Sequence, residues 1–161
     1  MKAASLAVAL FVLAGPSRAQ QASSAAPSVY DEKADAPAAV AAALSRAAAG
    51  HKRVLVDFGA NWCGDCLALD RNFHRPENSA LLESGFELVH ADIGHYDKNA
   101  KLAARYGGPL KKGVPALVVL DEKGRVVYAQ KKGEFESMRS LDPASVHAFL
   151  EKWKAPKASI R

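Results

Sequence analysis

The sequence has few cysteines, no dense run of basic residues and no long apolar run, and each of these absences argues against a class of protein. It contains two cysteines in 161 residues, so it is not a small domain stapled by several disulfides. Its formal charge of +5 is spread over several segments without a dense basic run, so we expect no nucleic-acid partner. Its longest apolar run, from Leu6 to Ala14, is well short of the ~20 residues that cross a bilayer. What remains is one soluble domain of ordinary composition.

The N-terminus has the pattern of a secretory signal. Lys2 precedes the apolar run, Gly15 and Pro16 end it, and Ser17 and Ala19 are small residues at the positions a signal peptidase recognises. We therefore expect residues 1–19 to be removed after Ala19. Residues 20–35 are small and polar, and we expect a flexible leader. The expected location is the periplasm, where disulfides persist.

The remaining segments predict a mixed α/β domain over residues 36–155, followed by a short tail, 156–161. Apolar runs and hairpin signals predict strands, and amphipathic periodicity predicts helices. Strands separated by helices favour parallel neighbours, whereas the turn 121–124 predicts an antiparallel hairpin. The expected strands are 53–59, 86–93, 116–120 and 125–129, and the expected helical segments are 37–49, 63–73, 75–85, 98–106 and 143–153.

Cys63 and Cys66 follow the first predicted strand and open a helix. A helix N-terminus carries a partial positive charge and free N–H groups, which stabilise a thiolate. Cys63 is then suited to attack a disulfide, and Cys66 to resolve the mixed disulfide. A structural zinc site would need further ligands, and the five histidines (51, 74, 90, 95 and 147) show no ligand spacing. A bridge over two residues also closes too short a loop to stabilise much.

Two motifs resemble the thioredoxin family. "VLVDFGANWCGDC", residues 54–66, is similar to its active-site segment, and "GVPALVVLDEKGRVV", residues 113–127, to its later proline strand and hairpin. The connecting stretch, residues 66–93, is closer to the exported branch that includes the C-terminal domain of the disulfide reductase DsbD. The resemblance spans about residues 50 to 155. It implies a thioredoxin-like fold, thiol–disulfide exchange and no cofactor.

The resemblance also implies roles for residues beside the cysteines. Asp57, which interrupts a buried strand, would exchange a proton with Cys66. Trp62 would flank the nucleophile at the surface. Pro115 matches the family's cis-proline, and Val114 before it would offer its backbone to an extended substrate.

Two positions depart from the family pattern. Gly59 stands where thioredoxins often have a bulky aromatic residue. Gly64 and Asp65 lie between the cysteines and are expected to set the redox poise, with Asp65 where thioredoxins commonly have proline. A carboxylate there should oppose a thiolate, which favours a reductant over a strong oxidant.

These patterns predict a monomeric oxidoreductase that acts on protein or small thiol and disulfide substrates, supplied with electrons by a membrane thiol donor. The same residues leave three alternatives open: a disulfide oxidase or isomerase, a thiol-based metal-delivery protein, and a substrate-holding chaperone.

Overall fold

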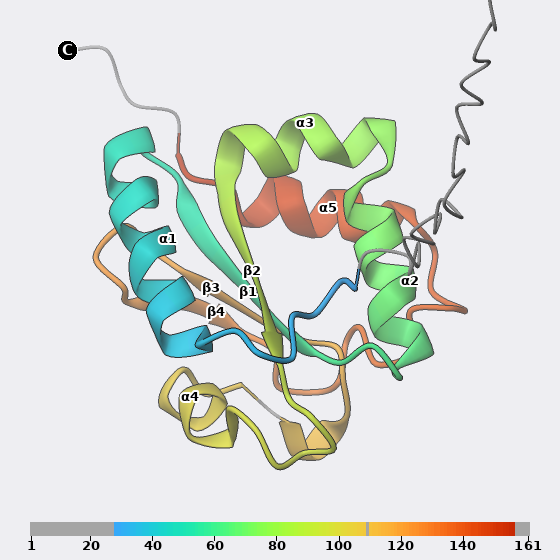
Figure 1. The fold of residues 1–161 in the computed structure, drawn as a ribbon. Helices are drawn as coiled ribbons and strands as arrows, with labels where there is room; N and C mark the ends of the chain where they lie inside the picture. The colour runs from blue at the N-terminus through green and yellow to red at the C-terminus, as the bar shows by residue number, and fades with distance from the viewer. Residues whose placement is uncertain (1–27, 109, 157–161) are drawn as a thin grey trace, which may run out of the picture.

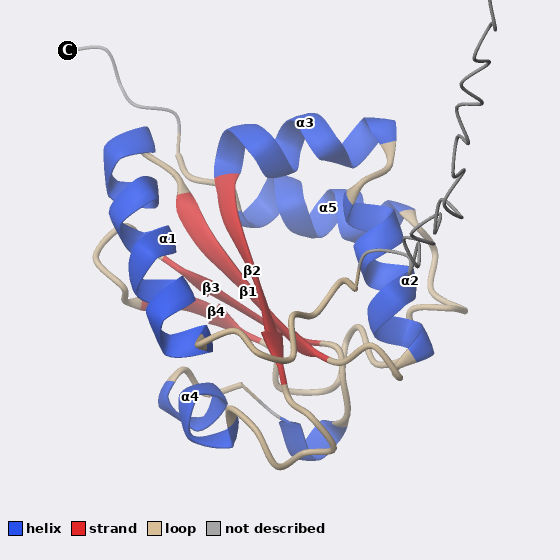
Figure 2. Ribbon diagram, in the orientation of Figure 1, coloured by secondary structure: helices blue, strands red, loops and turns tan. Residues whose placement is uncertain are grey.

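A computed structural model describes residues 28–108 and 110–156. The predicted signal peptide, residues 1–19, lies outside this range, as does all of the predicted tail except residue 156. Figures 1 and 2 show a central sheet flanked by helices. The elements, in chain order, are α1 (Ala36–Gly50), β1 (Arg53–Gly59), α2 (Gly64–Phe73), α3 (Pro76–Gly85), β2 (Phe86–Asp92), α4 (Ala100–Arg105), the 3-10 turn η1 (Leu110–Lys112), β3 (Ala116–Leu120), β4 (Val126–Ala129) and α5 (Ala144–Trp153).

The sheet has four strands in the order β2-β1-β3-β4. β1 and β2 are parallel, and β3 pairs antiparallel with both β1 and β4. The sheet is therefore mixed, as the sequence predicts. The parallel pair is joined through α2 and α3, because a parallel connection needs a long crossover.

Both faces of the sheet are covered. One face packs against α1 and α4, and the other against α2, α3 and α5 (Figure 1). Val54 and Val56 of β1 point to the first face, and Leu55 between them points to the second. Six of the seven β1 residues are buried, which agrees with the continuous apolar run.

The C-terminal end of β1 and the N-terminal end of β3 lie next to each other, because these two central strands are antiparallel. β1 ends at Gly59, and the loop after it leads into α2 with Cys63 as the N-cap residue. β3 begins at Ala116, which is paired with Phe58 of β1. This register places the start of α2 beside the loop that precedes β3.

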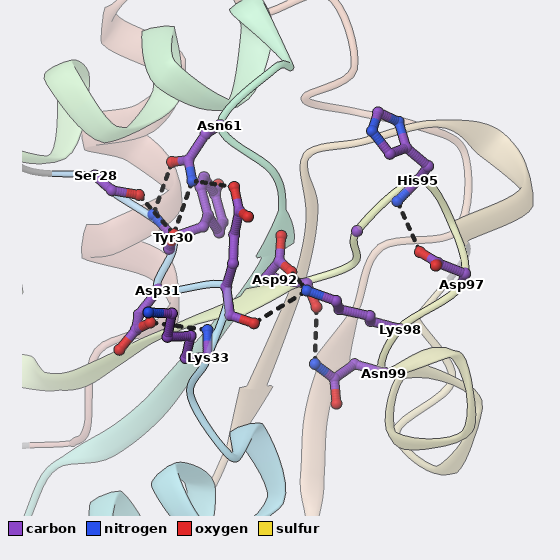
Figure 3. Close-up of polar contacts among 12 residues, drawn as sticks. Ser28, Tyr30, Asp31, Lys33, Asn61, Asp92, His95, Asp97, Lys98 and Asn99 are labelled. Carbon is purple, nitrogen blue, oxygen red and sulfur yellow. Dashed lines mark hydrogen bonds and ion pairs between the residues drawn. The ribbon is translucent and has the colours of Figure 1, made fainter.

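The structure corrects the expectation for the last part of the leader. Residues 28–35 lie against the domain, and the side chain of Tyr30 is fully buried in the core cluster beside α1. Asn61 donates a hydrogen bond to the Tyr30 carbonyl oxygen at 2.8 Å and accepts one from the Tyr30 N–H at 3.0 Å (Figure 3). An aromatic side chain this deeply packed makes the segment part of the fold. Within the described residues, no helix has the length and apolar character to span a bilayer.

Candidate active site

Cys63 and Cys66 form a disulfide at the N-terminus of α2, with their Cα atoms 5.2 Å apart. The Cys66 N–H points at Sγ of Cys63, with an N···S distance of 3.1 Å. A backbone N–H in this position stabilises negative charge on the Cys63 sulfur once the bond is broken. Cys63 is 6% exposed and lines a cleft, whereas Cys66 is fully buried. Only the first sulfur is thus placed to meet a substrate.

The loop before β3 lies against the disulfide. The peptide bond from Val114 to Pro115 is cis, as the resemblance implies. The carbonyl oxygen of Val114 is 3.6 Å from Sγ of Cys63. Gln130, which is fully buried, donates from Nε2 to the carbonyl oxygen of Pro115 at 3.0 Å and accepts from the N–H of Leu117 at 3.2 Å. These bonds fix the loop beside the sulfur.

Trp62 lies at the surface beside the cysteines, with half of its area exposed. Its Nε1–H donates to the carbonyl oxygen of Gly94 at 2.7 Å, and its ring stacks on His95 with centroids 5.7 Å apart. The indole is therefore held in place and presents one face to solvent.

A cleft of about 590 Å³ opens next to Cys63. Its walls come from the active-site loop with the start of α2, the loop between β2 and α4, the Val114 loop and the segment between β4 and α5. The lining residues are Trp62, Cys63, Gly64, Asp65, Tyr96, Gly113, Val114, Glu136, Ser137 and Arg139. Among the described residues that line it, Arg139 is the single cation, against two carboxylates.

Arg139 is paired with Asp65, and this pairing modifies the expected effect of Asp65. The Asp65 carboxylate accepts from the Arg139 backbone N–H at 2.8 Å and from Nη2 at 3.0 Å. The side-chain hydrogen bond from Arg139 is the main reason that the pKa of Asp65 lies below its ordinary value. The Arg139 side chain also lies across Gly64, since a Cβ added there would be 3.5 Å from its Cδ, Cζ and Nε atoms. Part of the negative charge between the cysteines is thus balanced.

Replacing Arg139 with Ala is expected to make the cysteine pair more reducing by roughly 5–20 mV. An exposed ion pair is worth about 0.2–1 kcal/mol, and 30 mV corresponds to about 1.4 kcal/mol for two electrons. Equilibration with glutathione buffers measures the potential. Arg125→Ala, which removes an arginine paired with Asp121 outside the cleft, is the control. An unchanged or more oxidising potential in Arg139→Ala would contradict this account of the pair.

Asp57 is fully buried and belongs to a polar cluster under the disulfide. Its Oδ2 accepts from the Tyr30 hydroxyl at 2.7 Å and lies 3.1 Å from Nδ1 of His90, its neighbour across the parallel β1–β2 pairing. Nε2 of His90 lies 3.4 Å from Oδ1 of Asp70 on α2. Burial lowers the pKa of His90, but the hydrogen bonds and charges of Asp57 and Asp70 outweigh it and raise the pKa to about 9. The buried carboxylate therefore has a cationic partner.

Tyr30, His90 and Asp70 belong to the site but were not predicted from the sequence. His90 has no ligand spacing to another histidine, and the signal that could have found it is the alignment of the two predicted parallel strands, which pairs it with Asp57. Tyr30 fell in the expected leader and carried no signal of burial beyond being aromatic. Asp70 lies one helical turn beyond Cys66, at a spacing that puts both on one side of α2.

The space beside Gly59 is filled by Tyr30. A Cβ added at Gly59 would clash with the Tyr30 hydroxyl, and would lie 2.6 Å from its Cζ and 2.9 Å from Sγ of Cys66. The aromatic group that thioredoxins often carry at this position is thus supplied here from the N-terminal segment. Gly59 allows the hydroxyl of Tyr30 and the sulfur of Cys66 to approach the same point.

Gly59→Ala is therefore expected to lower the free energy of unfolding by about 1–3 kcal/mol, the range for overpacking a close-packed core. Urea unfolding of the oxidised protein measures it. Gly50→Ala is a suitable control, because the nearest atoms to its added Cβ would belong to the flexible Lys52 side chain, at 3.5 Å, an ordinary contact distance. If Gly59→Ala and the unmodified protein had the same free energy of unfolding, the Tyr30 side chain would be able to move away from Gly59 without a loss of stability, contrary to this prediction.

Comparison with known proteins shows which family this chain belongs to. A sequence profile described as Thioredoxin-like matches residues 35–122, more than half of the chain. The chain belongs to the thioredoxin-like family. The matched range contains both cysteines, Asp57 and the cis-proline, so this is a thioredoxin-like thiol–disulfide oxidoreductase with an active-site CxxC disulfide.

Solved structures of related proteins share its fold. A disulphide isomerase from Xylella fastidiosa Temecula1 is 41% identical, with a TM-score of 0.76 over 80% of this chain and 98% of that one. A thioredoxin from Thermus thermophilus is 25% identical, with a TM-score of 0.52 over 70% of this chain and 81% of that one. The DsbD C-terminal domain from Neisseria meningitidis, 21% identical, has a TM-score of 0.55 over 75% of this chain and 97% of that one, which shows the fold.

The chain is also similar to a curated protein, Thioredoxin-3 from Dictyostelium discoideum. The two are 44% identical over 43 residues, which is 27% of this chain and 38% of that protein. The chain thus matches less than half the length of this relative. Within the part of the chain that the structure covers, no group of three or more His, Cys, Asp or Glu side chains is arranged to hold a metal ion.

Proposed function

We propose that this oxidoreductase works from its reduced, dithiol state and reduces disulfides of exported proteins. In this role Cys63 is the nucleophile and Cys66 the resolving thiol. Asp57 takes the Cys66 proton. The electrons are carried by the two sulfurs, without a cofactor.

The main support for a reductant, as opposed to an oxidant, is the balance of charges around the two cysteines. A strongly oxidising pair needs a stabilised thiolate in its reduced form. Here Asp65 and Glu136 line the cleft and Asp57 lies beneath the pair, while the nearby cations Arg139 and His90 are already paired with Asp65 and Asp57. These charges leave the thiolate with little stabilisation beyond the helix N-terminus, which favours giving electrons away.

The cleft suits a short extended segment of a protein substrate. Val114 borders it beside Cys63, with its carbonyl oxygen 3.6 Å from the sulfur, and an extended substrate segment could pair with this backbone as an added strand. Trp62 and Tyr96, both about half exposed, supply apolar surface to the same cleft. We propose a periplasmic location on the pattern of residues 1–19, and a membrane thiol donor that reduces the pair again.

The reduction potential of the Cys63–Cys66 pair tests the direction. A value near about −270 mV, typical of thioredoxin-like reductants, is expected, together with turnover of a disulfide-bonded protein substrate in the presence of a thiol donor. A value near about −120 mV would overturn the proposal in favour of an oxidase.

Isomerisation of exported disulfides is a second candidate. It is favoured by the 41% identity to the Xylella protein described as a disulphide isomerase, nearly all of which this chain matches. An isomerase also starts from the Cys63 thiolate, but it must release a substrate that still holds a disulfide. A potential near about −180 mV and recovery of activity from a scrambled disulfide-bonded protein, without net reduction, would favour it.

A further inference from the structure

Three polar side chains of the buried cluster have no part in the exchange steps above. Tyr30, His90 and Asp70 connect Asp57 with the surface of α2: Tyr30 and His90 both contact Asp57 Oδ2, and His90 bridges to Asp70. The side chains of Tyr30 and Asp57 are fully buried, and those of His90 and Asp70 are each 18% exposed. The row therefore runs from the protein interior to the solvent.

We propose that Tyr30 positions the Asp57 carboxylate to take the Cys66 proton, and that His90 passes a proton on to Asp70 and the solvent. This inference rests on the proposed function, since it concerns the resolving step of the same site. It makes Tyr30 and His90 positioning and relay residues that act through Asp57.

The position of Tyr30 supports its part in this route. Asn61, two residues before Cys63, holds the Tyr30 backbone by two hydrogen bonds (Figure 3). The next turn is fixed as well, because Lys98 bonds both the Glu32 carbonyl oxygen and Asp92. The segment is thus anchored to the active-site loop and to the loop after β2.

The Tyr30 hydroxyl remains a donor throughout. Burial and the charge of Asp57 raise the pKa of Tyr30 far above its ordinary value, so the hydroxyl keeps its proton and its bond to Oδ2. The other carboxylate oxygen, Oδ1, is buried and accepts no hydrogen bond from the described residues. It is the oxygen left to receive a proton, and the Tyr30 hydroxyl, which bonds Oδ2 of the same carboxylate, approaches the same point beside Gly59 as Sγ of Cys66.

The proton balance of the reaction follows from this arrangement. The Cys63 thiolate attacks a substrate disulfide and releases one substrate thiolate. The Cys66 thiol gives its proton to Asp57, its sulfur attacks Sγ of Cys63, and the second substrate thiolate leaves as the Cys63–Cys66 disulfide forms. The protein dithiol is oxidised, the substrate disulfide is reduced, and the buried cluster has gained the proton of Cys66.

His90 can release a proton toward the solvent in exchange for the one that Asp57 takes up. It faces Asp57 of β1 through Nδ1 and Asp70 of α2 through Nε2, and its ring packs edge-on against Tyr30. Once Asp57 is protonated at Oδ1, the His90 imidazolium loses the negative charge that stabilises it and can release its Nε2 proton to Asp70, while its Nδ1–H keeps the bond to Oδ2. One proton then leaves the cluster for the one that Cys66 supplies. Asp70 is also in contact with His74. Burial raises the pKa of Asp70, but the hydrogen bond with His90 and the charges of His90, His74 and Arg71 outweigh it and keep that pKa below the ordinary value. Asp70 then returns the proton to water.

Tyr30→Phe tests the proposal, because it keeps the ring and removes the hydroxyl. The reduced protein is mixed rapidly with an aromatic disulfide whose thiolate product is coloured. The first equivalent released reports attack by Cys63, and the second reports resolution by Cys66. In both Tyr30→Phe and His90→Gln we expect the rate of the first phase to be unchanged and the rate of the second to fall by about tenfold or more. A loss of this size is smaller than the roughly 10²–10⁴-fold that general base catalysis contributes, because Asp57 itself is still present. Tyr128→Phe, in the other core cluster, is the control.

A pH profile separates proton transfer from a general structural defect. At alkaline pH the Cys66 thiol ionises without help, so the deficit of both variants should shrink as the pH rises. Equal slowing of both phases, no slowing of the second, or a deficit that persists at alkaline pH would overturn the proposal. Failure of the unmodified protein to release two equivalents would instead refute the exchange function on which it rests.

Discussion

Cys66→Ser is expected to convert the protein into a trap that holds its substrates as mixed disulfides through Cys63. Turnover should fall on the order of 10⁴-fold or more, because catalytic residues that act as a unit fail together when one is removed. The asymmetry comes from the structure: the Cys63 sulfur lines the cleft beside Val114, whereas Cys66 is fully buried beneath it. Mass spectrometry under non-reducing conditions would detect the adducts, and their release by a thiol would confirm the linkage.

Cys63→Ser is the matched control for this experiment. It should lose turnover to the same extent without forming adducts, since Cys66 cannot reach a substrate from its buried position. Adducts on Cys63→Ser would contradict this assignment of nucleophile and resolving thiol. If the variant with both cysteines replaced by serine kept full activity, the protein would act by binding substrates, as a chaperone does, and not by thiol–disulfide exchange. Tight metal binding by the reduced protein would favour metal delivery.

The fold could be predicted from the sequence because its signals are local. The apolar run 53–59 requires burial on both faces, and the turn 121–124 predicts the hairpin that β3 and β4 form. The cysteine pair and Pro115 were also predictable, since each is part of a short motif. Strand order was harder, because the paired residues of β1 and β3 are 58 to 66 positions apart in the sequence, and no local pattern specifies such a neighbour.

The surroundings of the cysteines could not be predicted for the same reason. Arg139 reaches Asp65 from a segment 74 residues later, and Tyr30 reaches Asp57 from 27 residues earlier. Each contact depends on packing between distant segments, and a lone arginine or tyrosine has no spacing that marks it. The consequence is chemical: the charge on Asp65 taken alone overstated its effect on the thiolate, since its partner was not visible in the sequence.

Stability is expected to fall between about pH 6.5 and pH 9, because His90 gains its charge more readily in the folded protein. Its pKa is raised from 6.5 to about 9, chiefly by Asp57 and Asp70 against the opposing effect of burial. A raised folded pKa gives stabilisation that is complete below the unfolded value of about 6.5 and is lost as the pH rises through 9. At about 1.4 kcal/mol per unit, the contribution is about 3 kcal/mol.

Urea unfolding of the oxidised protein across this pH range, compared with His90→Gln, measures the effect without interference from free thiols. Below pH 6.5 the variant should be less stable by about 3 kcal/mol, because it leaves the buried Asp57 carboxylate without a cationic partner. Above pH 9 the difference should nearly close, since neutral His90 no longer supplies a charge. His95→Gln, which changes an exposed histidine, should follow the unmodified protein at every pH. If the free energy of unfolding of His90→Gln and of the unmodified protein changed with pH in the same way, His90 would not balance the charge of the buried Asp57 carboxylate. The reduction potential would then have to be explained by Arg139 and the helix N-terminus alone.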